Sequence, residues 1–122
     1  MADSNRLAGV AYVTVNGASY SISGEGTYRV SGSNRESLTG QDGYHGYSEK
    51  PMPGKISWKG RDSNKVTIGA LNESANATVV LELANGKTVI GRNMARTGEP
   101  LEVNTEDATF TVEFEGADVK EA

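Results

Sequence analysis

Few side chains in this sequence could perform acid–base or metal chemistry, and they are not grouped. The chain contains no Cys and one His, which excludes thiolate zinc sites, iron–sulfur ligation and cysteine nucleophiles and removes most histidine metal sites. Serines are frequent, but no Gly-x-Ser-x-Gly sequence is present to hold one as a nucleophile. The single His45 lies in a glycine-rich stretch, and we interpret it as a loop residue rather than a catalytic base.

Two groups of acidic residues resemble parts of known sites without completing them. Glu113 and Glu115 are two positions apart, so in a strand they share one face, and paired carboxylates serve glycosidases. The other face of that strand is apolar, which favours a solvated strand face over an active site. Gln41-Asp42-Gly43 resembles part of a calcium loop but lacks the other oxygen ligands. We therefore expect neither an enzyme nor a bound metal or cofactor.

The size and charge of the chain exclude several classes of protein. At 122 residues it is predicted to form a single domain over residues 1–122. The net charge of −4 argues against a surface that coats nucleic acid. The longest apolar run is about four residues, whereas a membrane span needs roughly 18. No charged-then-apolar segment opens the chain, so we expect a soluble protein made inside the cell, with no membrane insertion.

Charge is distributed unevenly along the chain. Residues 1–98 carry 11 Lys or Arg and 8 Asp or Glu, whereas residues 99–122 carry 1 and 8. An acidic end of this kind is either a solvated edge or a functional surface. Carboxylates repel phosphates, so they cannot grip DNA, but they could line a passage through which DNA slides. Because one domain has no passage, the second interpretation requires a ring of subunits.

Short strands and turns dominate the sequence pattern. Fifteen Gly, with frequent Ser, Thr, Asn and Val, favour short strands over long helices. Asn16-Gly17 and Asn85-Gly86 each separate two alternating runs and predict type I′ hairpin turns. One short helix is predicted over residues 66–74. Strands are predicted over residues 7–15, 18–23, 27–31, 55–61, 77–83, 87–92 and 109–115, with a turn at residues 24–26. This set indicates an all-β sandwich or barrel with one short flanking helix.

Residues 32–54 interrupt this pattern. They contain five of the 15 Gly and two of the three Pro, and they show neither helical nor strand periodicity. Loops longer than roughly 12–15 residues are uncommon inside domains and tend to be functional or disordered. Tyr44, His45 and Tyr47 lie in this segment, and a disordered linker usually lacks aromatic residues. We predict a long loop that becomes ordered against a partner.

Several segments together resemble a known protein family. They are Arg6-Leu7-Ala8-Gly9, Tyr12, Asn16-Gly17, Arg35-Glu36, residues 40–49 (GQDGYHGYSE), Asn76-Ala77-Thr78, residues 81–88 (LELANGKT), residues 102–106 (EVNTE) and Phe114-Glu115-Gly116. In this order they resemble the tail tube proteins of Mu-like contractile-tailed bacteriophages. The likeness extends over essentially the whole chain.

The resemblance implies a non-enzymatic virion protein without a cofactor. Members of that family form hexameric rings that stack into a hollow tube, and six copies contribute strands to one inner β-barrel. The implied partners are other copies of this chain, the tail sheath, baseplate and tail-terminator proteins and the tape measure protein, with DNA passing through the lumen unbound. The protein would be assembled in the host cytoplasm and located in the virion tail.

The resemblance also implies roles for the segment 32–54 and for the acidic side chains. We expect the segment 32–54 to contact neighbouring subunits, because aromatic residues are favoured at interfaces. The expected contact residues are Arg35, Glu36, Gln41, Asp42, Tyr44, His45 and Tyr47. We expect acidic side chains to face the lumen and repel phosphates, with Glu25, Glu82, Glu113 and Glu115 as candidates.

Two other functions stay open on the sequence alone. The tube of a related injection machine, such as a tailocin or secretion system, would share the fold and the stacking. A carbohydrate-binding β-sandwich would need an exposed aromatic platform. The only Trp, Trp58, alternates in phase with Ile56, so we expect it in the core rather than on such a platform.

Overall fold

The computed structural model describes residues 12–63 and 67–122, without the side chains of residues 24 and 25. The predicted strand residues 7–11, the start of the predicted helix and the segment Arg6-Leu7-Ala8-Gly9 therefore lie outside the described residues. The elements, in chain order, are β1 (Tyr12–Val15), β2 (Ala18–Tyr20), β3 (Ile22–Arg29), β4 (Gly32–Gly40), β5 (Gly43–Met52), β6 (Gly54–Arg61), α1 (Ile68–Asn72), β7 (Ala77–Glu82), β8 (Thr88–Thr97), β9 (Thr109–Gly116) and β10 (Asp118–Glu121). The predicted all-β class with one short helix is confirmed.

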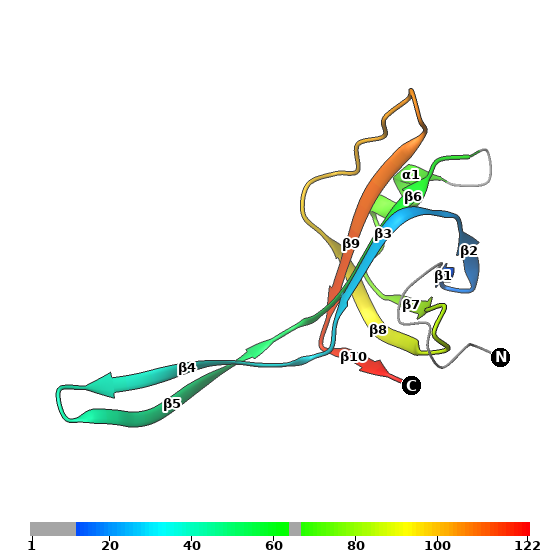
Figure 1. Ribbon diagram of the computed structural model, residues 1–122. Coiled ribbons are helices and arrows are strands. Elements are labelled where there is room, and N and C mark those ends of the chain that lie inside the picture. Colours follow the sequence, from blue (N-terminus) through cyan, green and yellow to red (C-terminus); the bar gives the residue numbers. More distant parts are fainter. Residues whose placement is uncertain (1–11, 64–66) are drawn as a thin grey trace.

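The main sheet is antiparallel and curls on itself, as Figure 1 shows. Its strand order is β2-β1-β7-β8-β9-β6-β3, and β10 pairs with β8 outside this path. β8 belongs to both halves of the curl, because its first part pairs with β7 and β10 and its last three residues pair with β9. Asn93, with φ of 53°, lies between these two parts, where the pairing of β7 with β8 shifts register. This bulge lets one strand turn from one half of the sheet to the other.

The core fills the inside of the curl. It takes the alternate residues Ile56 and Trp58 of β6 and Phe110, Val112 and Phe114 of β9, together with Val13, Val15, Leu71, Ala77, Val79, Leu81, Val89, Met94 and Val119. The rings of Trp58 and Phe114 are stacked, with centroids 5.6 Å apart and planes at 9°. Trp58 is 1% exposed, which confirms its predicted place in the core and removes it as a carbohydrate platform.

One predicted hairpin turn is confirmed and the other differs in detail. At the turn between β1 and β2, Asn16 and Gly17 both have positive φ, 51° and 86°, as a type I′ turn requires. In the turn between β7 and β8 only Gly86 has positive φ, and the Leu83 amide donates to the Lys87 carbonyl at 2.9 Å. The prediction of a two-residue turn at residues 85–86 is therefore wrong, because the chain closes a wider loop before β8 begins.

Two smaller predictions also need correction, and one strand was not predicted. Residues 24–26 do not form a turn but lie inside β3, where a register shift between Ile22 and Gly26 absorbs the irregular sequence. The separate strands predicted over residues 18–23 and 27–31 are accordingly β2 and one continuous β3. The strand β10 was not predicted, because its four residues carry no alternating run.

The largest correction concerns residues 32–54. They form the antiparallel hairpin of β4 and β5, which projects from the body of the molecule (Figure 1). Every residue of β4 is exposed, so neither face needs apolar side chains. Alternation of polar and apolar residues marks a strand only when one face is buried. The pattern is absent from the sequence for this reason.

Candidate functional site

The projecting hairpin is the first part of the candidate site. Its strands pair from Gly32 opposite Met52 at the root to Gly40 opposite Gly43 at the tip. Nine strand residues at about 3.3 Å each give a length of about 30 Å. Within the described chain, β4 and β5 pair only with each other, so both outer edges of the hairpin lack a strand partner. Exposed strand edges of this kind favour pairing with another chain.

One face of the hairpin combines aromatic rings with charge. Register places Glu49, Tyr47 and Tyr44 opposite Arg35, Ser37 and Thr39, which share one face because they alternate along β4. Tyr44 joins this face because the register shifts between Leu38 and Thr39. Arg35 Nε lies 2.6 Å from Glu49 Oε1, and the Arg35 guanidinium carbon lies 5.1 Å from the centre of the Tyr47 ring. Tyr44 and Tyr47 are 66% and 54% exposed. We call Arg35, Tyr44, Tyr47 and Glu49 the aromatic face; tyrosine and arginine are typical of protein interfaces.

A short hydrogen-bond contact between His45 and Asp42 lies at the tip of the hairpin. His45 Nε2 lies 2.6 Å from Asp42 Oδ1, so the single histidine closes the turn rather than facing a nucleophile. The His45 ring occupies the space that a Cβ on Gly40 would need. Gln41 lies in the exposed turn, and Glu36 lies on the opposite face from Arg35. All seven residues expected to form a contact segment thus lie on the hairpin, although on both of its faces.

The carboxylates expected at a lumen are not brought together. Glu113 and Glu115 share one face of β9, as the two-residue spacing predicts. Glu82 is exposed on β7, which β8 separates from β9. Glu25 lies in β3, and its side chain is outside the described residues.

The face of Glu113 and Glu115 also differs in charge from the expectation. β6 places Lys55 opposite Glu115 and Lys59 opposite Thr111, so both lysines share this face with the carboxylates. Lys55 Nζ lies 3.3 Å from Glu113 Oε1, and Thr97 Oγ1 donates to Glu115 Oε1 at 3.1 Å. We call these residues, with Ser57, the polar face of β6 and β9. It is a surface of mixed charge rather than an acidic one, because the register of β6 with β9 places Lys55 and Lys59 beside the glutamates.

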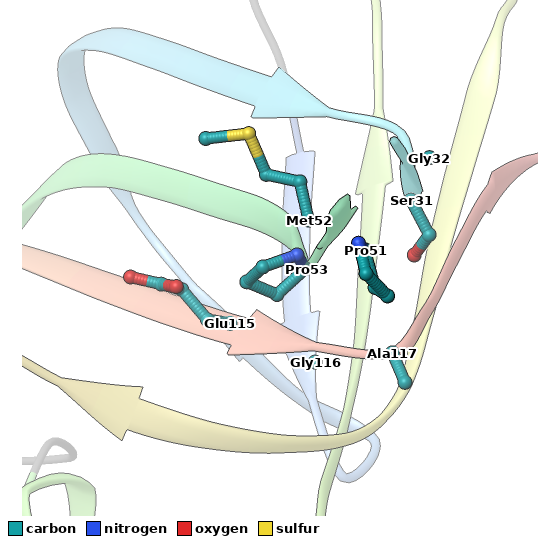
Figure 2. Close-up of a pocket in the computed structure, with 8 residues that line it drawn as sticks. All are labelled: Ser31, Gly32, Pro51, Met52, Pro53, Glu115, Gly116 and Ala117. Carbon is teal, nitrogen blue, oxygen red and sulfur yellow. The ribbon is translucent and has the colours of Figure 1, made fainter. Parts of the chain in front are cut away.

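A groove marks the root of the hairpin, where β4 and β5 join the body (Figure 2). It encloses about 410 Å³, and most of its lining is apolar. The lining residues are Ser31, Gly32, Pro51, Met52, Pro53, Glu115, Gly116 and Ala117. No sequence pattern indicated it, because its residues come from three distant segments.

The C-terminal strand is tied to the body beside this root. Lys87 Nζ lies 3.0 Å from Glu121 Oε2, and this hydrogen bond raises the pKa of Lys87 above its ordinary value. The Ala122 amide donates to the Thr88 carbonyl at 2.8 Å. Both contacts hold β10 along β8.

The described residues form no candidate metal centre. No group of three or more His, Asp or Glu among them is placed to hold a metal ion. In the same part of the chain, no helix has the length and apolar character to cross a membrane. The arrangement offers surfaces for contact: a projecting hairpin, a polar sheet face and strand edges that lack a partner among the described strands.

The fold is similar to those of three solved chains. They come from structures described as the sheath/tube terminator of the extracellular contractile injection system PVC in the extended state, the tube-terminating cap of the anti-feeding prophage, and the PVC sheath–tube complex in the extended state. The TM-scores are 0.62, 0.61 and 0.60, at 13%, 12% and 12% sequence identity. Each match covers 92% of this chain, and 92%, 87% and 87% of the other chains. At these identities the likeness concerns the fold.

Sequence comparison identifies the family directly. Among curated protein sequences, none matches this chain. The family model described as phage tail tube protein matches residues 4–121, which is nearly the whole sequence. The chain therefore belongs to the phage tail tube protein family.

Proposed function

We propose that this chain forms hexameric rings that stack into the hollow inner tube of a contractile phage tail of the Mu-like type. The observation that carries the proposal is the distribution of exposed apolar side chains. Six large hydrophobic side chains are exposed among the residues that the structure describes, and five of them lie on the hairpin or at its root. These five are Val30, Leu38, Tyr44, Tyr47 and Met52. Exposed apolar groups concentrated on a projecting element indicate a surface that another protein covers.

The shape of the chain supports stacking rather than a closed pair. If the hairpin of one subunit binds a different surface of the next subunit, the contact is heterologous. Such contacts yield closed rings or open stacks, depending on the rotation that relates one subunit to the next. β2 and β3 end the main sheet, and each keeps one edge without a strand partner among the described strands. Pairing of such edges between neighbouring subunits would satisfy their backbone groups and join the sheets of six copies.

The polar face of β6 and β9 is the proposed lining of the channel. Glu113 and Glu115 would repel phosphates, with Glu25 and Glu82 as further candidates. Lys55, paired with Glu113 at 3.3 Å, would reduce the charge that the passing DNA meets. A lining of mixed, internally paired charge lets DNA slide without a strong attraction in either direction.

The proposed partners follow from this role. Other copies of the chain would make the tube, the sheath protein would surround it, and the baseplate, tail-terminator and tape measure proteins would set its ends and length. The tube would be assembled in the host cytoplasm and reside in the virion tail.

Electron microscopy of the purified chain over a concentration series tests the proposal. We expect hollow tubes or stacked rings of uniform diameter. The double variant Tyr44→Ala/Tyr47→Ala should remain folded and lose assembly. Tyr12→Ala is the matched control, because Tyr12 is 69% exposed on β1 of the body and should assemble normally. Unchanged tubes in the double variant would overturn the assigned contact, and a wild-type chain inert even with baseplate and sheath proteins would overturn the tube.

The tube of a phage-like injection machine is the second candidate. The structural neighbours favour it, because their descriptions name an extracellular contractile injection system and an anti-feeding prophage. The two functions differ in cargo. Particles containing this chain should protect DNA from nuclease if they are phage tails joined to capsids, and should lack protected DNA if they are injection machines.

A further inference from the structure

We infer that the C-terminal strand β10 locks the direction of the projecting hairpin through Ser31 and Gly54. The hairpin joins the body through two segments only: Ser31 precedes β4, and Gly54 follows β5. Both segments meet β10 at the same residue, Val119. This inference rests on the proposed function in one respect, namely that the direction of the hairpin matters because it contacts another subunit.

Ser31 forms hydrogen bonds with both the backbone amide and the backbone carbonyl of Val119. The Ser31 amide donates to the Val119 carbonyl at 3.0 Å, and the Val119 amide donates to Ser31 Oγ at 2.8 Å. Val119 is 1% exposed, so a group left unpaired here would lack water as a substitute partner. Ser31 Oγ is therefore the acceptor that completes the pairing of β10.

Gly54 lets the second segment approach β10 closely. A Cβ at Gly54 would overlap the Val119 side chain and would lie 2.8 Å from Ser31 Oγ. The two segments of the root are also joined to each other, because Arg29 Nε donates to the Pro53 carbonyl at 3.0 Å. Ser31, Gly54 and Val119 thus form one tightly packed point, which we call the root lock.

β10 in turn is fixed to the body. It pairs with β8 from Asp118 opposite Arg92 to Glu121 opposite Val89, and its last residues are held by the Lys87–Glu121 ion pair. In Figure 1, β10 lies where the hairpin leaves the body. The chain of contacts from β8 through β10 to Ser31 therefore connects the core to the root of the hairpin.

Because the hairpin is long, a small rotation at its root moves its tip by a large distance. With an arm of about 30 Å, a rotation of about 10° at the root moves the tip by about 5 Å. A shift of that size is larger than a hydrogen bond tolerates. A loosened lock would misplace Tyr44 and Tyr47 while the body stayed folded.

Distance measurement between spin labels tests the lock directly. The chain has no native Cys, so cysteines at Gln41 in the hairpin tip and Thr78 on β7, both exposed, would carry the two labels. The distance distribution is measured on monomer isolated by gel filtration. Ser31→Ala, which removes the acceptor for the Val119 amide, should broaden it by about 5 Å. Gly54→Ala, which displaces Val119, should broaden it as well.

Ser33→Ala is the matched control, because Ser33 is an exposed serine of β4 two residues beyond the lock. It should leave the distribution as in the wild type. Circular dichroism should show a folded body in every variant, and the two lock variants should yield less pelletable assembly than the control.

The outcomes separate the two proposals. If the distance distributions of Ser31→Ala and Gly54→Ala are both as narrow as that of the wild type, the root lock is overturned, whatever the chain assembles into. Broadened distances in a chain that never forms tubes support the lock and overturn the proposed function.

Discussion

At the scale of single residues, an aromatic stack forms part of the core of the body. Trp58 and Phe114 lie on adjacent strands, are stacked at 5.6 Å and are almost fully buried. Trp58 Nε1 is buried without a hydrogen-bond partner in the described structure. An unpaired buried N–H costs free energy, so the indole stabilises the body through its ring and not through its polar atom.

Two substitutions separate these contributions. Trp58→Ala should lower the free energy of unfolding by about 3–5 kcal/mol, because it leaves a large cavity beside Phe114. Trp58→Phe keeps a stacking ring and removes the unpaired N–H, so its cost should be clearly smaller. Urea unfolding followed by circular dichroism measures both, and equal losses would show that a stacked phenyl ring recovers no stability at this position, which would contradict the assigned role of the stack.

At the scale of elements, turn chemistry decides which glycines are required. Gly17 has φ of 86° in the β1–β2 turn, and Gly69 lies in α1 with open space where a Cβ would be. Gly17 is needed for its backbone conformation, whereas Gly69 only weakens its helix.

These two glycines make a matched pair. Gly17→Ala should destabilise the chain by about 1–2 kcal/mol, because a Cβ disfavours the left-handed conformation. Gly69→Ala should stabilise it by about 0.5–1 kcal/mol through a better helix propensity. Thermal unfolding of both variants gives the comparison, and a Gly17→Ala variant as stable as wild type would contradict the assigned turn.

The elements also show what a sequence can and cannot predict. The strands β1, β6, β7 and β9 were predictable because each has one buried face, which leaves apolar residues such as Val79 and Leu81 at alternate positions. β4 and β5 were not, since both of their faces are exposed. The residues expected to make contacts were chosen by type and by family resemblance, and their arrangement on the two faces of the hairpin depends on the register of β4 with β5.

The groove and the root lock were beyond prediction for another reason. Their residues are distant in sequence: Ser31 and Val119 are 88 positions apart. No local period connects them. Only the packing of β10 along β8 and beside β6 brings them together.

At the scale of the whole molecule, the body and the hairpin are separable parts. The buried core lies entirely in the curled sheet and α1, and the hairpin adds no buried apolar residue to it. Stability of the body should therefore be independent of the hairpin tip, while assembly should depend on it.

Deletion of residues 40–48 tests this separation. Arg35 and Glu49 would then be joined by residues 36–39, and the body would keep every core contact. We expect a folded monomer with an unfolding temperature within a few degrees of wild type that no longer forms tubes. Sedimentation velocity and circular dichroism measure the two properties, and tubes formed by the shortened chain would show that the hairpin tip is dispensable.

The stacked Trp58 has a consequence for how the molecule can be observed. It is the only tryptophan in the chain, and it lies in the body, whereas Tyr44 and Tyr47 lie on the hairpin. Tryptophan emission will thus report melting of the core and remain silent when the hairpin moves or engages a neighbour. Tyr12, Tyr20 and Tyr28 of the body also contribute to tyrosine emission. A change in tyrosine emission at constant tryptophan emission will therefore mark engagement of the hairpin, without any added label.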